Sequence, residues 1–133
     1  MNESSNQIKI ALVGHCGPDA FALKAAIAGF VPGAQVDQLN SSVDFLGSAS
    51  TYQLYCVNRV LDGTFESESG IELIRNHSAE FPPMMLISNF PESLQEAVEA
   101  GGCEGFGKRA MRSEEARAAL LNALDSNTNE GHT

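Results

Sequence analysis

The stretch PPMMLISNF, residues 82–90, decides the fold of this chain. It contains an uninterrupted apolar run, MMLI at 84–87, which is followed by Asn89 and Pro91. Such a run is typical of a central strand in a parallel sheet, because helices cover both faces of that strand. Asn89 and Pro91 suit the cap and the first turn of a helix. The segment therefore predicts a buried strand that is followed directly by a helix.

The same strand-then-helix pattern recurs on both sides of this segment. Further strands are expected at 8–13 (IKIALV), 34–39 (AQVDQL), 52–57 (YQLYCV) and 105–108 (GFGK). Helices are expected at 18–30, 41–47, 70–77, 91–100 and 113–124. Five strands that each precede a helix imply parallel pairing through right-handed crossovers. The pattern predicts an α/β fold of the flavodoxin-like, doubly wound (βα)5 type, with a five-stranded parallel sheet of order 2-1-3-4-5.

The length and composition fit one globular domain. The chain has 133 residues, of which 43% are hydrophobic and 19% charged, a balance that supports a packed core. We expect a disordered N-terminus over 1–7, a domain over 8–125 and a flexible tail over 126–133. No apolar run approaches the roughly 20 residues that a membrane-spanning helix needs, and the polar start lacks the pattern of a secretory signal.

The net charge indicates which classes of partner are disfavoured, and the cysteines indicate the expected cellular compartment. Eight Lys and Arg against seventeen Asp and Glu leave a formal net charge of −9. This charge disfavours binding to nucleic acids and to anionic membrane surfaces. The cysteines, Cys16, Cys56 and Cys103, are odd in number and lack zinc-like spacing. A cytoplasm in which thiols stay reduced is therefore the expected location.

Four segments, in the right order, carry a resemblance to one family. They are VNRVLDG (57–63), SGIELIR (69–75), PPMMLISNF (82–90) and AGGCEGFGK (100–108). Together they resemble the receiver domain of bacterial response regulators, over about residues 9–124. The resemblance implies a signalling module of a two-component system or phosphorelay. It implies no conventional enzyme activity, and the chain shows neither a nucleophile–base pair nor a cofactor fingerprint.

The resemblance also assigns family positions to residues of this chain. Asn58 stands at the position of the phosphoacceptor aspartate, and Gly14 and His15 stand at the positions of the acidic pair that helps to hold Mg²⁺. Ser88 stands where the family carries a hydroxyl side chain, and Lys108 stands at the position of its phosphate-binding lysine. Mg²⁺ prefers charged oxygen ligands, and an amide is a poor nucleophile. We therefore expect a pseudo-receiver that is not phosphorylated on aspartate and has no cofactor, the Mg²⁺ site of the family being lost.

The expected switch residues differ from the family as well. The family carries an aromatic residue three positions before its lysine, where this chain has Gly105, and Phe106 would face the other side of the strand. The family lysine is usually followed by a cis proline, whereas Lys108 is followed by Arg109. A cis bond there would cost about 2.5–4 kcal/mol.

Asp62 is an alternative phosphoacceptor. It lies eight residues before Gly70, so an ungapped match to the family would place it at the end of a longer third strand. That register would bury Asn58 and Arg59 inside a central strand, at a high cost for an unpaired charge. The register that ends the strand at Asn58 is preferred, and phosphorylation at Asp62 remains an alternative function.

The loop 14–18 (GHCGP) suggests a third function, a sensor of a small ligand or a metal. Imidazole and thiolate groups, as in His15 and Cys16, suit Zn²⁺ or copper ions, and the loop offers backbone N–H groups to an anion. A closed metal site needs further ligands, and only Asp19 or Asn58 is near in sequence or expected position. No metal is therefore assigned.

A basic cluster suggests how the domain would meet a partner. The cluster consists of Lys108, Arg109, Arg112 and Arg117 in an otherwise acidic chain, and the first three are the expected partner-binding residues. They are expected near the edge formed by the fourth helix, the fifth strand and the fifth helix, which receivers commonly use for docking. We expect a protein partner there, either a histidine kinase, another regulator or a second copy of the chain in a homodimer.

Overall fold

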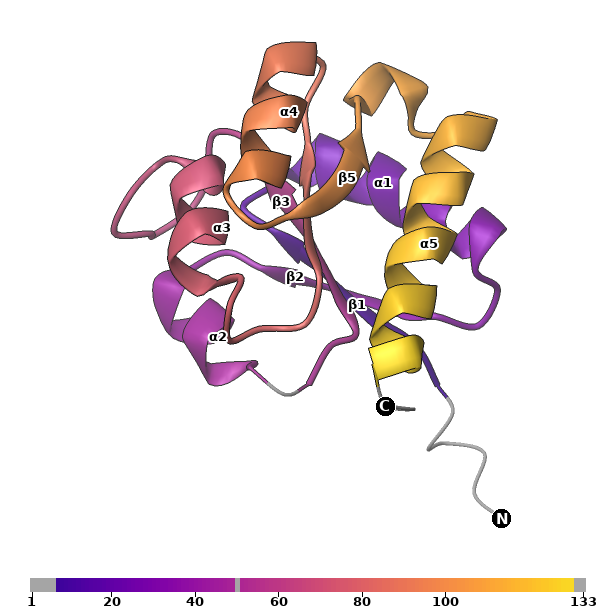
Figure 1. Ribbon diagram of the computed structural model, residues 1–133, viewed down its shortest axis with the longest axis horizontal. Coiled ribbons are helices and arrows are strands. Elements are labelled where there is room, and N and C mark those ends of the chain that lie inside the picture. The colour runs from indigo at the N-terminus through magenta and orange to yellow at the C-terminus, as the bar shows by residue number, and fades with distance from the viewer. Residues whose placement is uncertain (1–6, 50, 131–133) are drawn as a thin grey trace.

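The computed structural model describes residues 7–49 and 51–130, the last five of these through their backbone alone (Figure 1). Its strands are β1 (Lys9–Val13), β2 (Gln35–Leu39), β3 (Leu54–Asn58), β4 (Met84–Ile87) and β5 (Cys103–Phe106). Its α-helices are α1 (Gly17–Phe30), α2 (Ser42–Gly47), α3 (Gly70–His77), α4 (Pro91–Glu99) and α5 (Glu114–Glu130). A 3-10 helix, η2 (Lys108–Ala110), lies between β5 and α5.

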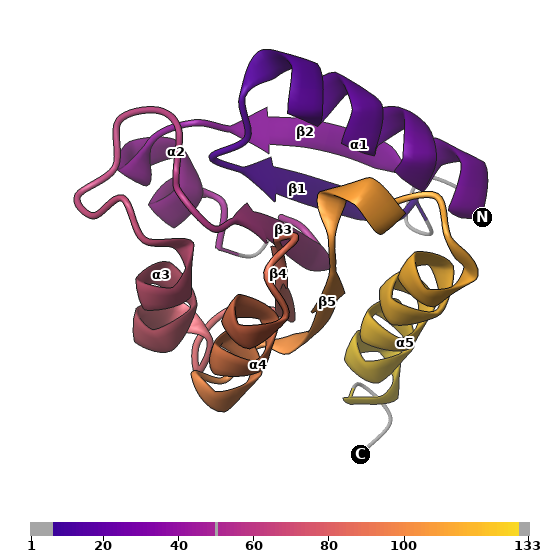
Figure 2. The ribbon, with the colours of Figure 1, turned by 90° about the horizontal axis from the view of Figure 1, so that it is seen from above.

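The five strands form one parallel sheet of order β2-β1-β3-β4-β5, so the predicted fold class is confirmed. Figure 2 shows α1 and α5 on one face of the sheet and α2, α3 and α4 on the other. Strand β4 is buried at all four positions, as expected for a strand that is covered on both sides.

Each face of the sheet has its own core. Side chains alternate between the two faces along a strand, so Ile10 and Leu12 pack with α1 and α5, while Ala11 and Val13 pack with α2, α3 and α4. The second core contains stacked rings of Phe45 and Phe81 with centroids 4.6 Å apart. These two cores hold the carboxyl ends of the strands, and hence the loops beyond them, in one place.

Two predicted boundaries are wrong near β5. The strand was expected at 105–108 but spans Cys103–Phe106, because Lys108 already belongs to η2. Asn89 was expected to cap α4, but the cap residue is Phe90. The side-chain oxygen of Asn89 instead accepts the backbone N–H of Arg109 at 2.9 Å, so a tertiary partner replaces the local one.

The last helix is longer than predicted, since it was expected to end at residue 124. Helix α5 continues to Glu130, because no proline or glycine interrupts the chain before Gly131. The expected disorder over 1–7 and the expected flexible tail over 126–133 stay predictions, and residues 1–6 and 131–133 lie outside the described residues. Within the described part of the chain, no helix is both long enough and apolar enough to cross a membrane.

Candidate functional site

Asn58 lies at the centre of the loops beyond the carboxyl ends of the strands. It is the last residue of β3, as the preferred register predicted, and its side chain is buried. Its amide nitrogen donates to the carbonyl oxygen of Gly14 at 3.0 Å and to that of Val60 at 2.8 Å. An amide N–H₂ group has two hydrogens to donate, and both have a partner here. Asn58 therefore joins the loop after β1 to the loop after β3.

Gly14 has no room for a side chain. Its φ angle of 73° lies in the left-handed region, and an added Cβ would come within 2.6 Å of Cδ2 of Leu61 and 3.0 Å of its Cα. Leu61 is itself buried and fills this space. An acidic residue at position 14 would therefore strain the backbone and displace Leu61.

His15 is buried and neutral. Its Nε2 atom lies 3.0 Å from the carbonyl oxygen of Cys56, so Nε2 carries the proton and donates it. The other ring nitrogen, Nδ1, is buried without a hydrogen-bond partner among the described residues. Burial lowers the pKa of His15 to about 4, and the positive charge of Lys108 adds to the effect.

Lys108 forms an ion pair with helix α1. Its Nζ atom donates to a carboxylate oxygen of Asp19, in the first turn of α1, at 2.7 Å. This hydrogen bond holds the pKa of Asp19 below its ordinary value. The peptide bond between Lys108 and Arg109 is trans. Lys108 thus joins the loop after β5 to α1.

The surroundings of Ser88 and Gly105 also restrict what these two positions can do. Ser88 is buried, and its hydroxyl oxygen accepts the backbone N–H of Phe90 at 3.2 Å. A Cβ atom at Gly105 would overlap the carbonyl oxygen of Leu86 in β4. An aromatic side chain at position 105 would therefore require β5 to move away from β4.

A pocket of about 310 Å³ brings four of the predicted site residues together. Its lining contains Asn58, Arg59, Val60, Ile87, Ser88, Asn89, Phe90, Lys108 and Arg109. Gly14, His15, Asp62 and Arg112 were also predicted site residues, but they do not line it. Asp62 is exposed in the loop beyond β3, and its backbone N–H donates to Gly14 at 2.9 Å.

The residues at the three positions that the resemblance assigns to the Mg²⁺ site do not fit this ion. Gly14 has no side chain, His15 presents a buried nitrogen, and Asn58 presents only an uncharged amide. Mg²⁺ takes oxygen ligands, at least one or two of them carboxylates. The loop 14–18 does not fit Zn²⁺ either, because no group of three or more His, Cys, Asp or Glu side chains suits a metal within residues 7–49 and 51–130.

Three residues of this region, Leu61, Arg59 and Phe90, make contacts that the sequence analysis did not predict. Leu61 excludes a side chain at Gly14, and Arg59 stacks over the ring of Phe90, with its guanidinium carbon 4.8 Å from the ring centroid. The importance of Leu61 could have been predicted from the sequence, because a leucine in a loop next to polar residues is expected to be buried. The pairing of Arg59 with Phe90 joins two loops and had no local signal.

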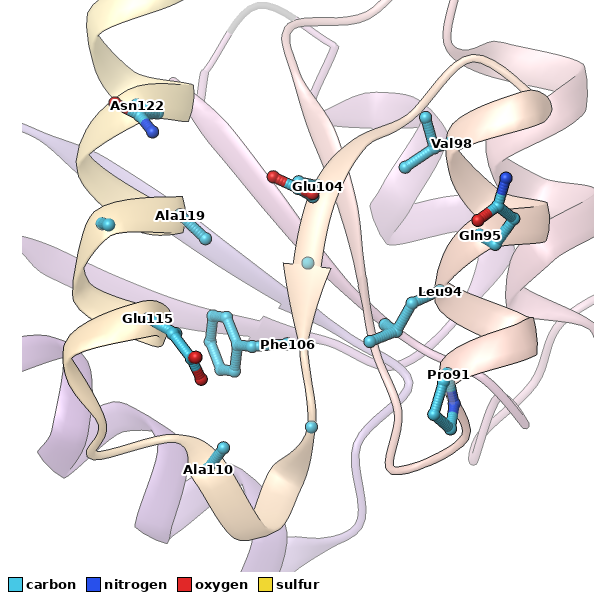
Figure 3. Close-up of a pocket in the computed structure, with 13 residues that line it drawn as sticks. Pro91, Leu94, Gln95, Val98, Glu104, Phe106, Ala110, Glu115, Ala119 and Asn122 are labelled. Atoms are coloured by element: carbon cyan, nitrogen blue, oxygen red, sulfur yellow. The ribbon is translucent and has the colours of Figure 1, made fainter.

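A second hollow of about 650 Å³ runs between α4 and α5 across β5 (Figure 3). Leu94 and Val98 line it on the α4 side, and Glu115 and Ala119 line it on the α5 side. We call it the α4–α5 groove. Its floor is β5, where Gly105 contributes no side chain.

Two of the residues in the predicted basic cluster already form ion pairs within the chain. Lys108 pairs with Asp19, and Arg117 pairs with Glu114 at 3.1 Å. Arg109 and Arg112 are exposed, and neither takes part in an ion pair with any residue that the structure describes. Arg109 and Arg112 are therefore the two cations of the cluster that remain available to a partner.

A parallel sheet of order 2-1-3-4-5 with helices on both faces defines the flavodoxin-like, doubly wound class of fold. No family model matches the chain, and no curated protein matches it. Among solved structures, it resembles a putative response regulator from Chloroflexus aurantiacus, with a TM-score of 0.73 and 16% identity over 90% of this chain and 99% of that one.

Two further structures show the same likeness. A response regulator from Thermotoga maritima matches with a TM-score of 0.69 and 16% identity over 90% of this chain and 98% of that one. The RcsB response regulator of Salmonella typhimurium, described for its DNA interaction, matches with a TM-score of 0.68 and 16% identity over 88% of this chain. This chain spans 61% of that RcsB chain. The particular fold is therefore that of response-regulator receiver domains.

Proposed function

We propose that this chain is a receiver-type module of a two-component system or phosphorelay that works by binding a protein and is not phosphorylated on aspartate. The observation that carries the proposal is the double hydrogen bond from Asn58 to Gly14 and Val60. The residue at the phosphoacceptor position thus donates hydrogen bonds that join two loops, and it offers no nucleophile. The receiver fold of its structural neighbours supports the signalling class.

The chemistry of the neighbouring residues supports the same proposal. Transfer of a phosphoryl group to a carboxylate needs that carboxylate and a bound metal to neutralise the phosphoryl oxygens. Leu61 occupies the space of one acidic position, and buried His15 occupies the other. The proposal therefore includes the loss of the family's Mg²⁺ site.

The first prediction concerns phosphorylation. After incubation with Mg²⁺ and acetyl phosphate, the intact mass of the wild-type protein should show no added phosphoryl group, because no carboxylate lines the pocket at Asn58. The Asp62→Asn variant serves as the control. A stoichiometric adduct that is present in the wild type and absent from Asp62→Asn would overturn the proposal and make Asp62 the acceptor.

The proposed docking surface consists of Arg109, Arg112 and the adjoining α4–α5 groove. A partner with acidic side chains beside an apolar segment would match the two free cations and the groove walls of Leu94 and Val98. The candidates are a histidine kinase, another regulator or a second copy of this chain.

The second prediction tests this surface by charge reversal. Arg109→Glu with Arg112→Glu should reduce recovery of a cross-linked partner, or of a dimer in sedimentation velocity, by about tenfold, because two attractions become repulsions. Lys24→Glu is the control, since Lys24 is exposed on α1 and takes part in no ion pair with any residue that the structure describes. Lys108 is left unchanged, because its reversal would place a carboxylate against Asp19. Equal recovery with the wild type and with the double variant Arg109→Glu, Arg112→Glu would contradict the proposed surface.

A further inference from the structure

The pocket at Asn58 concentrates positive charge in an acidic chain. Three of the eight Lys and Arg residues line it, whereas the chain as a whole has a formal net charge of −9. None of the described residues that line the pocket is an aspartate or a glutamate. The concentration of charge indicates an anion as the occupant.

Two of these cations are free to bind an anion. Lys108 already pairs with Asp19, but Arg59 and Arg109 take part in no ion pair with any residue in 7–49 and 51–130. The guanidinium of Arg59 is stacked over Phe90, which restricts its orientation and leaves its N–H groups available. The backbone N–H of Arg109 is held by Asn89 at 2.9 Å, which fixes the start of η2 at the pocket.

The other walls of the pocket add an apolar surface. Val60 and Phe90 are large hydrophobic residues that are 49% and 50% exposed, and both line the pocket. The volume of about 310 Å³ lies at the lower end of the range for small-molecule sites. Its occupant would therefore combine an anionic group with a small organic part.

We propose that this pocket binds a small organic phosphate without covalent transfer, with Arg59 and Arg109 contacting the phosphate and Val60 and Phe90 contacting the organic part. A guanidinium presents several N–H donors in a planar fork, which matches phosphate oxygens. Because Gly14, His15 and Asn58 bring no negative charge to this end of the sheet, no nearby carboxylate at these positions repels the anion. The pocket shares Arg109 with the proposed docking surface, whereas Arg59, Val60 and Phe90 lie outside that surface, so Arg59→Gln tests the pocket alone.

The test is a titration of the full chain with phenyl phosphate, inorganic phosphate and phenol at constant ionic strength, followed by calorimetry and by ¹⁵N chemical shifts. Phenyl phosphate should bind saturably and more tightly than inorganic phosphate, and phenol should not bind. Arg59→Gln should weaken phenyl phosphate binding at least about tenfold, because a charge-assisted contact is lost. Arg117→Gln, which removes the same charge from α5, should bind like the wild type.

Either of two results would overturn the proposal. One is the absence of saturable phenyl phosphate binding, and the other is equal affinity in Arg59→Gln and Arg117→Gln. Arg109→Gln is the second pocket variant and should show the same loss, so a folding defect in Arg59→Gln leaves the test intact. An unchanged intact mass after the titration would show that binding is non-covalent, which separates this result from phosphorylation at Asp62.

Discussion

The Asn58→Asp variant should be less stable than the wild type by about 3 kcal/mol at pH 7 and should not gain phosphorylation. The amide of Asn58 donates to carbonyl oxygens of Gly14 and Val60, at 3.0 and 2.8 Å. A carboxylate has no hydrogen to donate, so both bonds would be lost and its charge would face two carbonyl dipoles in a buried position. We therefore expect that an aspartate at position 58 does not restore a phosphoacceptor in this chain.

The free energy of unfolding should be measured by urea denaturation at pH 7 and again below pH 4. Protonation of the introduced carboxyl at low pH gives back one donor, so the deficit relative to the wild type should shrink there. Asn122→Asp is the matched control, because Asn122 is exposed on α5. Equal stability of the two variants, or a phosphoryl adduct on Asn58→Asp, would contradict the structural role assigned to Asn58.

The second large effect is the response of the protein to mild acid through His15. The pKa of His15 is lowered from 6.5 to about 4 in the folded protein, so the unfolded chain binds the proton more tightly. The stability that depends on neutral His15 is therefore complete above pH 6.5 and is lost as the pH falls toward 4. Between pH 7.5 and pH 5 the free energy of unfolding should fall by about 2 kcal/mol from this residue.

Comparison of the wild type with His15→Gln isolates this contribution from other titrating groups. Glutamine stays neutral and still has N–H donors for the carbonyl oxygen of Cys56, so the variant should lose most of the decline between pH 7.5 and 5. An NMR titration of the His15 ring should show it neutral at pH 5. Identical pH profiles for the two proteins, or a ring that protonates near pH 6.5, would contradict the buried neutral state.

These two residues explain how a receiver fold can persist without the acidic positions. Asn58 bonds to the carbonyl oxygen of Gly14 in the loop after β1, and His15 bonds to that of Cys56 in β3, so both side chains join separate elements of the fold. Leu61 adds an apolar contact above Gly14. The loops are thus held together by hydrogen bonds and packing, with no need for a metal to join them.

The elements that the sequence predicted well are those with a strong local signal. The run MMLI is β4 as predicted, and the polar residues Ser41 and Ser69 cap α2 and α3 through bonds to the next turn. Strand β5 was misplaced, because a strand with Gly105 in it has little apolar periodicity. The role of Asn89 was misjudged, since its partner is the backbone of Arg109, 20 residues further along the chain.

The sequence by itself determined the fold class and the strand order, because periodicity, caps and breakers act over one or two turns of chain. Only the tertiary structure decided what the site residues contact. Asn58, His15 and Lys108 bond to Gly14, Cys56 and Asp19, which are 44, 41 and 89 residues away along the chain. Such partners meet only when parallel strands bring their carboxyl ends to one edge of the sheet, and no local pattern encodes which atoms then face each other.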